Sequence, residues 1–478
     1  MLENKRKKIF LTISHGWQAR LLLQTEFLNS LLNNNLEIII FTPCGKEKGF
    51  LKEFSDKATI IETVQQGGIL WSRFNNIRRY LVSGKMSKTK EILLEKYTQN
   101  QPMYSFITSV INSFFKYIPI TKKIFSFFDR LIFRDSFYKH YFDKYKPDAV
   151  IIVSTVHNEA HYMLQRSYIE GVKCIHIVES WDNPSAKLNQ IKHPDYFLVW
   201  NESMAEELNE FLGIKKNRIH ITGSAFHDIA SDKKTFASKQ DIARRYGMDP
   251  DKKWILIAST LSNLYPDFDY FLGNLNSMKL NNSLHEEFQI LIRPHPQAIS
   301  GYSIGHGIED LKKIQKQYSY IFFDIPRVIK SKLPVYLESS DIKNYSEILN
   351  IADVVISFFS TATIDASILN TPVILPAFGN YQEMASYPTM KERVQFTHHS
   401  KLIATNGVSL SYNYGELADE LNKYLSLKDD RVNERKRLVE YQCGAIDGLS
   451  YKRMSEAIIN IVNNDSEYTD TKGYIYYY

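Results

Sequence analysis

Short apolar runs rich in β-branched residues alternate with amphipathic stretches along most of the chain. The first unit is a strand over residues 8–14, a loop with the sequence HGWQAR, an amphipathic helix over 21–33 and a strand over 36–42. These strands lack polar alternation, which is typical of a parallel sheet covered by helices on both faces. The pattern therefore predicts an α/β fold with a doubly wound sheet.

The same alternation of strands and helices continues through the first half of the chain, with one interruption. Residues 70–146 look mostly helical, and the strand–helix alternation then resumes. Strands are expected at 147–154, 172–180, 194–201 and 218–223, with a helix over 202–212. We therefore predict an N-terminal Rossmann-like domain over 1–223 that carries a helical insertion at 70–146.

A second half follows a polar segment at 224–240, which lacks apolar periodicity and is interpreted as a junction. Strands are expected at 252–260, 287–296, 354–357 and 373–375, and helices at 267–278, at 345–350, from 361 on, and at 415–425, 432–441 and 449–462. We assign 224–448 to a second Rossmann-like domain and 449–478 to a C-terminal helix and tail that could cross back to the first domain.

Composition narrows the class of protein. Apolar residues make up 44% of the 478 residues, enough for two full cores. Cys44, Cys174 and Cys443 are widely separated and form no C-x-x-C pair, so neither a disulfide framework nor a zinc site is expected. The basic N-terminus precedes an apolar run only a strand long, and no apolar run reaches ~18 residues. We expect no signal peptide, no membrane-spanning helix and a cytoplasmic location.

Positive charge is concentrated in the helical insertion. Residues 104–146 hold 14 aromatic side chains, eight Lys or Arg and three Asp, a local charge of +5 in a chain whose total is +6. The side chains that suggest a cationic aromatic surface are Phe114, Phe115, Tyr117, Phe125, Phe128, Lys122, Lys123, Arg130 and Arg134. Such a surface can contact the inner face of an anionic membrane or hold a polyanionic or lipid-linked acceptor. Alternatively, the aromatic residues face a core and the charges face solvent. No binding module for nucleic acid accompanies the charge, so nucleic acid is not an expected partner.

Polar residues at the end of a buried strand predict an anion site in the second half. Ser357, Ser360 and Thr361 stand at the carboxyl end of the strand at 354–357, where open α/β sheets bind their ligands. The helix after them directs free N–H groups at the same place, which suits phosphate, and Asp365 lies about one turn further on. Alternatively, Ser360 or Thr361 only caps this helix.

Two further strand ends are expected at the same edge. Ser259 and Thr260 end the first strand of the second half. Arg293 and His295, in the sequence RPHP, end the next one. Arginine can bind two phosphate oxygens at once, and a neighbouring imidazole can donate a further hydrogen bond. The alternative is a surface turn stiffened by the two prolines.

Candidate proton acceptors collect at the strand ends of the first half. His15 follows the first strand beside Gly16, whose small size lets a ligand approach, and His157, Glu179 and Asp182 follow later strands. These ends share one face of a parallel sheet, so the four side chains could line one cleft. His15 leads as a general base because an unperturbed imidazole titrates near neutral pH, although a structural role in the loop is the alternative. The G-x-G-x-x-G fingerprint is absent, which argues against a nicotinamide or flavin enzyme.

These features together resemble a GT-B glycosyltransferase. More narrowly, the second half is similar to bacterial CDP-glycerol glycerophosphotransferases and capsule polysaccharide transferases. In those families an R-x-H-P segment and a later A-D-x-x-I-S-x-x-S-[ST]-x-x-x-[DE] segment surround the nucleotide diphosphate of the donor, and they correspond here to residues 293–296 and 352–365. The ESWDNPSAKLN segment at 179–189 resembles another signature of this superfamily. Phe358 and Phe359 depart from the polar or tyrosine pair that is common before the serine dyad, which leaves the base contact open.

The resemblance implies a transferase that moves a sugar or polyol phosphate from a nucleotide-activated donor to a hydroxyl of a surface-polysaccharide or lipid-linked acceptor. It implies neither a cofactor nor a divalent metal. The predicted donor residues would stabilise the leaving nucleotide diphosphate, and His15, His157 or Glu179 would act as the base, oriented by Asp182.

Two rivals remain. A UDP-sugar 2-epimerase shares the fold and the diphosphate site, but it uses carboxylates near the sugar and has no polymer acceptor. A non-catalytic polysaccharide assembly protein would keep the fold without turnover. The basic aromatic insertion favours the transferase over the epimerase, since an enzyme that acts on a soluble sugar nucleotide has no use for it.

Overall fold

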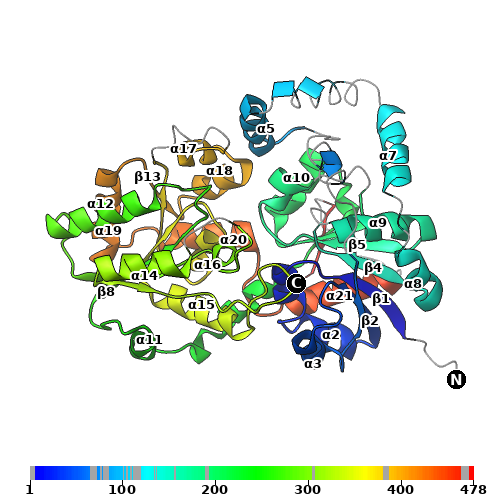
Figure 1. Cartoon of the computed structure of the whole chain (residues 1–478), viewed down its shortest axis with the longest axis horizontal. Coiled ribbons are helices and arrows are strands. Elements are labelled where there is room, and N and C mark those ends of the chain that lie inside the picture. The colour runs from blue at the N-terminus through cyan, green and yellow to red at the C-terminus, as the bar shows by residue number, and fades with distance from the viewer. Residues whose placement is uncertain are drawn as a thin grey trace.

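Two α/β lobes lie side by side, each built on one parallel sheet (Figure 1). The computed structural model describes the chain apart from residues 1–5, 65–70, 72, 76–77, 79–84, 101, 104–105, 108–109, 111–112, 114–119, 134, 136, 155–157, 189–192, 304–306, 380–386, 464–472 and 478. Within the described ranges, no helix is long and apolar enough to cross a lipid bilayer. The two-domain architecture predicted from the strand pattern is confirmed.

The first sheet has eight strands in the order β14-β7-β6-β5-β4-β1-β2-β3, all parallel to their neighbours. Their bounds are β1 Lys7–Thr12, β2 Leu36–Thr42, β3 Thr59–Glu62, β4 Ala149–Ile152, β5 Lys173–Ile177, β6 Tyr196–Val199, β7 Ile219–Ile221 and β14 Ile475–Tyr476. The strand order reverses between β1 and β4, so a crevice for ligands is expected beyond their carboxyl ends.

The second sheet has six parallel strands in the order β10-β9-β8-β11-β12-β13. Their bounds are β8 Lys253–Ala258, β9 Phe288–Arg293, β10 Ile321–Phe323, β11 Val354–Ser357, β12 Val373–Pro376 and β13 Ser409–Ser411. Here the order reverses between β8 and β11. The short strands β3, β10, β13 and β14 were not predicted, because segments of two to four residues carry little periodicity of their own.

Helices cover both faces of each sheet. In the first lobe they are α1 Gly16–Leu22, α2 Phe27–Asn33, α3 Lys48–Phe54, α5 Lys88–Asn100, α7 Ile120–Ile132, α8 Tyr138–Tyr145, α9 Asn158–Glu170, the π-helix η1 Asn183–Lys187, α10 Glu202–Leu212 and the 3-10 turn η2 Lys216–Arg218. The junction forms the 3-10 segment η3 Ala225–Thr235. The second lobe carries α11 Lys239–Tyr246, α12 Phe268–Leu280, α13 Pro296–Ile299, α14 Ile308–Gln317, α15 Ser340–Ile351, α16 Ala362–Ile368, α17 Met390–Arg393, α18 Thr397–Ala404, α19 Tyr414–Leu425 and α20 Val432–Cys443.

The chain returns to the first lobe at its end. Helix α21 (Ser450–Asn463) packs against α2, and its apolar face joins the core of the first lobe. Asp228 of the junction accepts hydrogen bonds from the N–H groups of Ser450 and Tyr451, at 3.0 and 2.8 Å, and so holds the start of this helix. The tail, whose purpose the sequence did not indicate, then adds β14 to the edge of the first sheet beside β7.

The segment expected as a loop followed by one helix is two helices. HGWQAR lies almost entirely within α1, which begins at Gly16. The break before α2 coincides with Thr25, whose hydroxyl donates to the Leu21 carbonyl at 2.8 Å and accepts the Phe27 N–H at 3.4 Å. Such local side-chain bonds compete with continuation of the helix. As a consequence Arg20, expected in a loop, is carried on a helix and buried.

A segment of the second lobe, residues 326–337, packs against the first. Tyr336 belongs to the core of the first lobe, and the Gly16 N–H donates to the Pro334 carbonyl at 2.8 Å. A Cβ on Gly16 would lie 2.1 Å from the carbonyl oxygen of Val335. Gly16 therefore makes room for this interlobe segment, and the sequence-based expectation that it makes room for a ligand is corrected.

Candidate active site

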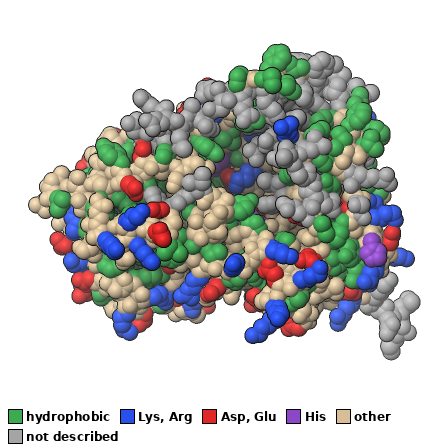
Figure 2. Space-filling view, in the orientation of Figure 1, with side chains coloured by type: hydrophobic (Ala, Val, Ile, Leu, Met, Phe, Trp, Pro, Cys, Tyr) green, Lys and Arg blue, Asp and Glu red, His purple; other side chains and the backbone are tan. Residues whose placement is uncertain are grey.

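A cavity of about 390 Å³ lies between the two lobes. The space-filling view shows a hollow between them (Figure 2). The first lobe lines the cavity with residues that follow β1 and β5, and the second with residues that follow β8, β9 and β11. The carboxyl ends of both sheets therefore face one cavity, where open α/β sheets bind their ligands.

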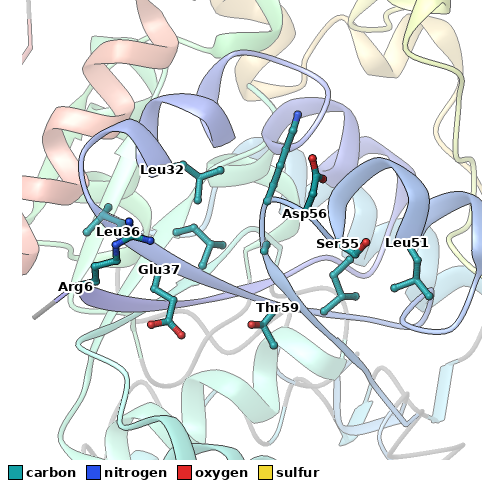
Figure 3. A pocket seen from close by; sticks show the side chains of 12 residues that line it. Arg6, Leu32, Leu36, Glu37, Leu51, Ser55, Asp56 and Thr59 are labelled. Atoms are coloured by element: carbon teal, nitrogen blue, oxygen red, sulfur yellow. The ribbon is translucent and has the colours of Figure 1, made fainter.

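A second hollow, of about 450 Å³, lies elsewhere on the first lobe (Figure 3). Its lining includes Arg6, Leu32, Leu36, Glu37, Leu51, Ser55, Asp56 and Thr59. Leu36 and Thr59 are the first residues of β2 and β3, so this hollow lies at the amino ends of the strands, opposite the expected ligand edge. None of the predicted site residues lines it, and the interlobe cavity is therefore the candidate site.

Nine of the twelve predicted site residues line the interlobe cavity: Glu179, Asp182, Ser259, Thr260, Arg293, His295, Ser360, Thr361 and Asp365. His15 and Ser357 do not line it. His157 lies outside the described residues.

His15 caps helix α1 and does not stand on the cavity wall. Its Nδ1 accepts the N–H of Trp17 at 3.3 Å, and its buried ring packs edge-to-face on Tyr302 with 5.7 Å between centroids. At this strand end Trp17 and Arg20 form the wall of the cavity. The expectation that His15 faces the donor across the cleft is thus not met, because the chain turns into a helix directly after it.

Ser357 stands behind the cavity wall and supports it. Its fully buried Oγ lies 3.0 Å from Ser360 Oγ and accepts a hydrogen bond from Thr363 Oγ1 at 2.9 Å. Thr361 occupies the cap position of α16 without a capping hydrogen bond from its side chain, so the capping alternative is not supported for it. Phe359, which lies between Ser357 and Ser360 in the chain, adopts φ of 55°. This left-handed conformation is costly for a non-glycine residue and is typical of ligand sites.

Arg293 is held by two carboxylates of its own lobe. Its Nη1 donates to Asp324, its Nη2 donates to Asp341 at 2.6 Å, and its guanidinium lies 4.8 Å from the centre of the Tyr345 ring. Burial opposes the charge, but the two carboxylates raise the pKa of Arg293 above its usual value. Arg293 reaches the cavity with its charge already compensated, which corrects the expectation of an arginine devoted to phosphate.

His295 is oriented as a neutral hydrogen-bond donor. Its Nδ1 accepts the N–H of Gln297 at 3.2 Å at the start of α13. Burial lowers the pKa of His295 to about 4, so the ring is uncharged near neutral pH. In a neutral imidazole whose Nδ1 is an acceptor, the proton is on Nε2. His295 therefore presents one N–H donor in the cavity wall.

Glu179 has the properties of a general base. Burial raises the pKa of its carboxyl to about 7, against the opposing effects of Lys187 and of hydrogen bonds from Ser154 and Gln18. Gln18 is itself oriented, because its Oε1 accepts the N–H of Ser14 at 2.7 Å. A carboxylate on a cavity wall that titrates near neutral pH can accept a proton from a substrate hydroxyl.

Asp182 shares the cavity with Glu179 but is kept ionised. Ser180 Oγ donates to it at 2.6 Å, and Lys187 Nζ lies 2.8 Å away. Burial works against the charge, but Lys187, His398 and Ser180 together hold the pKa of Asp182 below its usual range. Two carboxyl groups whose pKa values are pushed apart in one cavity are typical of acid–base sites.

Several lining residues escaped the sequence analysis: Trp17, Arg20, Lys187, Trp181, Trp200, Arg393, His398 and His399. Three of them form an aromatic wall between the lobes, since Trp181 packs on His398 and His399 at centroid distances of 4.9 and 5.5 Å. His398 Nδ1 also lies 3.1 Å from Ser185 Oγ of the first lobe. The adjacent pair of histidines was a signal in the sequence, but it does not directly follow a strand, because α18 comes after the helix α17.

A smaller cavity of about 320 Å³ adjoins the main one. The two share Asp182, Lys187, Phe359, Arg393, His398 and His399, and the smaller one continues to Thr89 and Leu93 of α5. Its wall is closed by α18, where the Thr397 N–H donates to Thr89 Oγ1 at 2.9 Å. The candidate site thus has two connected compartments, and the second leads towards the helical insertion.

Among the described residues, no group of three or more His, Cys, Asp and Glu side chains could hold a metal ion.

The two sheets and the cavity between their carboxyl ends define a GT-B-like two-domain protein. The sequence profile described as CDP-glycerol:poly(glycerophosphate) glycerophosphotransferase matches residues 177–460, more than half of the chain. The chain belongs to this family of transferases.

Solved structures show the same fold at low sequence identity. S. aureus MnaA, in a co-structure with UDP, is 13% identical with a TM-score of 0.54 over 96% of this chain and 97% of its own. A glycosyltransferase from Rickettsia africae ESF-5 is 12% identical with a TM-score of 0.52 over 96% of this chain and 100% of its own. A UDP-GlcNAc 2-epimerase from Neisseria meningitidis, bound to UDP-GlcNAc, is 13% identical with a TM-score of 0.50 over 95% and 100%. No curated protein matches the chain.

Proposed function

We propose that this protein transfers glycerol phosphate from CDP-glycerol to a hydroxyl of a surface polymer or its lipid-linked precursor. The family is named for CDP-glycerol and poly(glycerophosphate). The observation that carries the proposal is the interlobe cavity, in which Glu179 of the first lobe faces the same space as His295, Ser360 and Thr361 of the second. A nucleotide-activated sugar is the alternative donor within the same fold.

The reaction proceeds at phosphorus. The acceptor hydroxyl oxygen attacks the phosphorus that carries the glycerol, and its proton passes to the Glu179 carboxylate. As the new O–P bond forms, the bond from that phosphorus to the bridging diphosphate oxygen breaks, and cytidine monophosphate leaves with the electron pair. A glycosyl transfer would instead release the nucleotide diphosphate, as the GT-B resemblance by itself implied.

Charge that develops on phosphate oxygens is stabilised by fixed donors in the cavity wall. The second lobe supplies the His295 imidazole and the hydroxyls of Ser360 and Thr361, and Ser360 is held in place by Ser357. Phosphoryl transfer depends mainly on positioning and on such electrostatic stabilisation. We propose that these side chains act without a divalent metal.

Purified protein is expected to release cytidine monophosphate from CDP-glycerol when a glycerophosphate primer is present, with and without EDTA. Loss of turnover in EDTA that Mg²⁺ restores would reject the metal-independent mechanism. UDP-N-acetylglucosamine without an acceptor is the matched control: its epimerisation would support the 2-epimerase instead. Absence of turnover with CDP-glycerol, UDP-sugars and GDP-sugars would leave the non-catalytic assembly protein.

The insertion supports a membrane-bound or lipid-linked acceptor. Helix α7 lies at the outer side of the first lobe (Figure 1), and its side chains differ in exposure. Asp129 of α7 is buried and accepts a hydrogen bond from Arg78, and Phe133, directly after the helix, is buried too, so this side anchors the helix. The opposite face is exposed and apolar at spacings of three and four residues: Ile124 49%, Phe127 56%, Phe128 50% and Leu131 59%. An exposed apolar helix face within a segment of net positive charge is typical of proteins that lie on anionic membranes.

We expect the protein to co-sediment with liposomes that contain anionic lipid, and less so as salt is raised, since each basic residue near the surface contributes about 1 kcal/mol. The triple variant Phe127→Ser, Phe128→Ser, Leu131→Ser should lose this binding. Leu280→Ser is the matched control, because Leu280 is 75% exposed on α12 of the other lobe. If the triple variant and the control bind anionic liposomes equally well, the membrane contact lies elsewhere.

A further inference from the structure

Arg20 is a buried cation with two guanidinium nitrogens that make no hydrogen bond to the described residues. It lies on α1 of the first lobe, is 3% exposed and lines the interlobe cavity. Its Nε and Nη2 have no hydrogen-bond partner in the part of the chain that the structure describes. Burial lowers the pKa of Arg20 to about 10, against the effect of Asp341, so the guanidinium stays charged at neutral pH. A buried charge without a hydrogen-bonded partner is strongly unfavourable, and its retention indicates a ligand.

The two carboxylates near Arg20, Asp341 and Asp365, accept hydrogen bonds from groups other than Arg20. Asp341 accepts a hydrogen bond from Arg293 at 2.6 Å. Asp365 accepts one from the Tyr345 hydroxyl at 2.9 Å, while its other oxygen, 3.5 Å from His227 Nε2, has no hydrogen-bond partner among the described residues. The positive charge of the neighbouring Arg293 further disfavours a second cation here. Among the described contacts, Arg20 therefore forms no ion pair with a carboxylate, whereas Arg293 in the same cavity forms two.

Aromatic rings hold the Arg20 guanidinium at the junction of the two lobes. Its centre lies 4.6 Å from the Phe226 ring, 5.7 Å from the Trp17 ring and 5.9 Å from the Tyr345 ring. Tyr345 belongs to the second lobe and also packs on Arg293. Ring faces orient a guanidinium without using its N–H donors. Nε and Nη2 form one edge of the planar group, and such an edge matches two oxygens of a phosphate.

We propose that Arg20 is a phosphate-binding residue that reaches from the first lobe to the donor site of the second. The inference deepens the proposed function, because it assigns the first lobe a direct contact with the substrate phosphates. The diphosphate of the donor and a phosphodiester of the acceptor polymer present the same oxygens. Binding there gives the unused edge of Arg20 its hydrogen-bond acceptors and ties the two lobes together through the ligand.

The test compares wild-type protein with Arg20→Gln, which keeps much of the length and removes the charge. Isothermal titration with pyrophosphate, with CDP and with a short glycerophosphate oligomer is expected to show a loss of affinity of about 10- to 100-fold for the ligand that Arg20 contacts. If the affinities for pyrophosphate and CDP both fall, Arg20 binds the diphosphate of the donor. If only the affinity for the oligomer falls, Arg20 binds a phosphodiester of the acceptor. Arg244→Gln, at an exposed arginine of α11, is the matched control and should bind as wild type does.

A second readout separates ligand binding from a structural role. Without ligand, Arg20→Gln should melt no lower than wild type, because it removes an unpaired buried charge. A lower melting temperature together with wild-type affinity for all three ligands would overturn the inference, and so would the absence of any pyrophosphate, CDP or oligomer binding to wild type. If Arg20→Gln loses ligand affinity but wild type never turns over CDP-glycerol, the inference stands and the proposed reaction fails.

Discussion

Glu179→Gln is expected to reduce turnover by about 100- to 10,000-fold and to leave nucleotide binding nearly intact. The substitution keeps the shape of the side chain but removes the proton acceptor. The measurement is a single-turnover rate with CDP-glycerol and primer, beside nucleotide titration of the same variant. Wild-type turnover in Glu179→Gln would return the role to His15 or His157, whose alanine variants belong in the same assay.

The pH dependence of turnover provides a second test of Glu179 as the general base. Because the base must be ionised and burial raises the pKa of Glu179 to about 7, turnover should rise with pH up to about 7 and then level off. Glu207→Gln is the matched control: burial also raises the pKa of Glu207 to about 7, but this residue pairs with Lys401 at 3.1 Å and does not line the cavity. Its variant should keep the wild-type pH profile.

Stability provides the control for folding. A carboxyl whose pKa is raised in the folded state binds its proton more tightly there than in the unfolded chain. The stability that this contributes is therefore lost as pH rises from 4.5, the ordinary pKa of a glutamate carboxyl, through about 7. Glu179→Gln lacks this loss, and at pH 8 its free energy of unfolding should equal or exceed that of wild type. Inactivity of a destabilised Glu179→Gln would not support a general base.

Arg293→Ala should lower the free energy of unfolding by about 3–5 kcal/mol, as expected when one partner of a buried ion pair is removed. The substitution leaves the carboxylates of Asp324 and Asp341 buried without their cation. The sequence pattern assigned Arg293 to phosphate binding alone, and we now expect its replacement to affect folding as well. Urea unfolding followed by circular dichroism measures the change.

A double variant and a variant of the nearby His295 test whether lost charge compensation causes the lower stability of Arg293→Ala. Arg293→Ala combined with Asp324→Asn should recover part of the lost stability, since one uncompensated charge is removed with its partner. His295→Ala should behave differently, with weaker nucleotide binding and little loss of stability, because His295 is neutral and half-buried in the cavity wall. Equal stability of Arg293→Ala and wild type would mean that the two aspartates are protonated or hydrated when the arginine is absent.

Much of the architecture follows from local pattern. The strand at 354–357 and the helix at 202–212 were placed to the residue, because apolar β-branched runs and a 3.6-residue period are properties of neighbouring residues. The same pattern puts Glu179, Arg293 and Ser360 at the carboxyl ends of parallel strands, and all three line the cavity. The sequence by itself therefore determined the fold class and the edge of each sheet at which the site lies.

The tertiary structure alone decided what the side chains at that edge can do. Arg293 is compensated by Asp324 and Asp341, whereas Arg20, which looked like a loop residue, is buried with donors unused. Glu179 rather than His15 faces the cavity with a pKa near neutrality. Charge compensation, burial and the resulting pKa depend on groups that lie 31, 48 or more residues away in the chain. Local periodicity carries no information about such partners, because they meet only when the strands and the two lobes pack together.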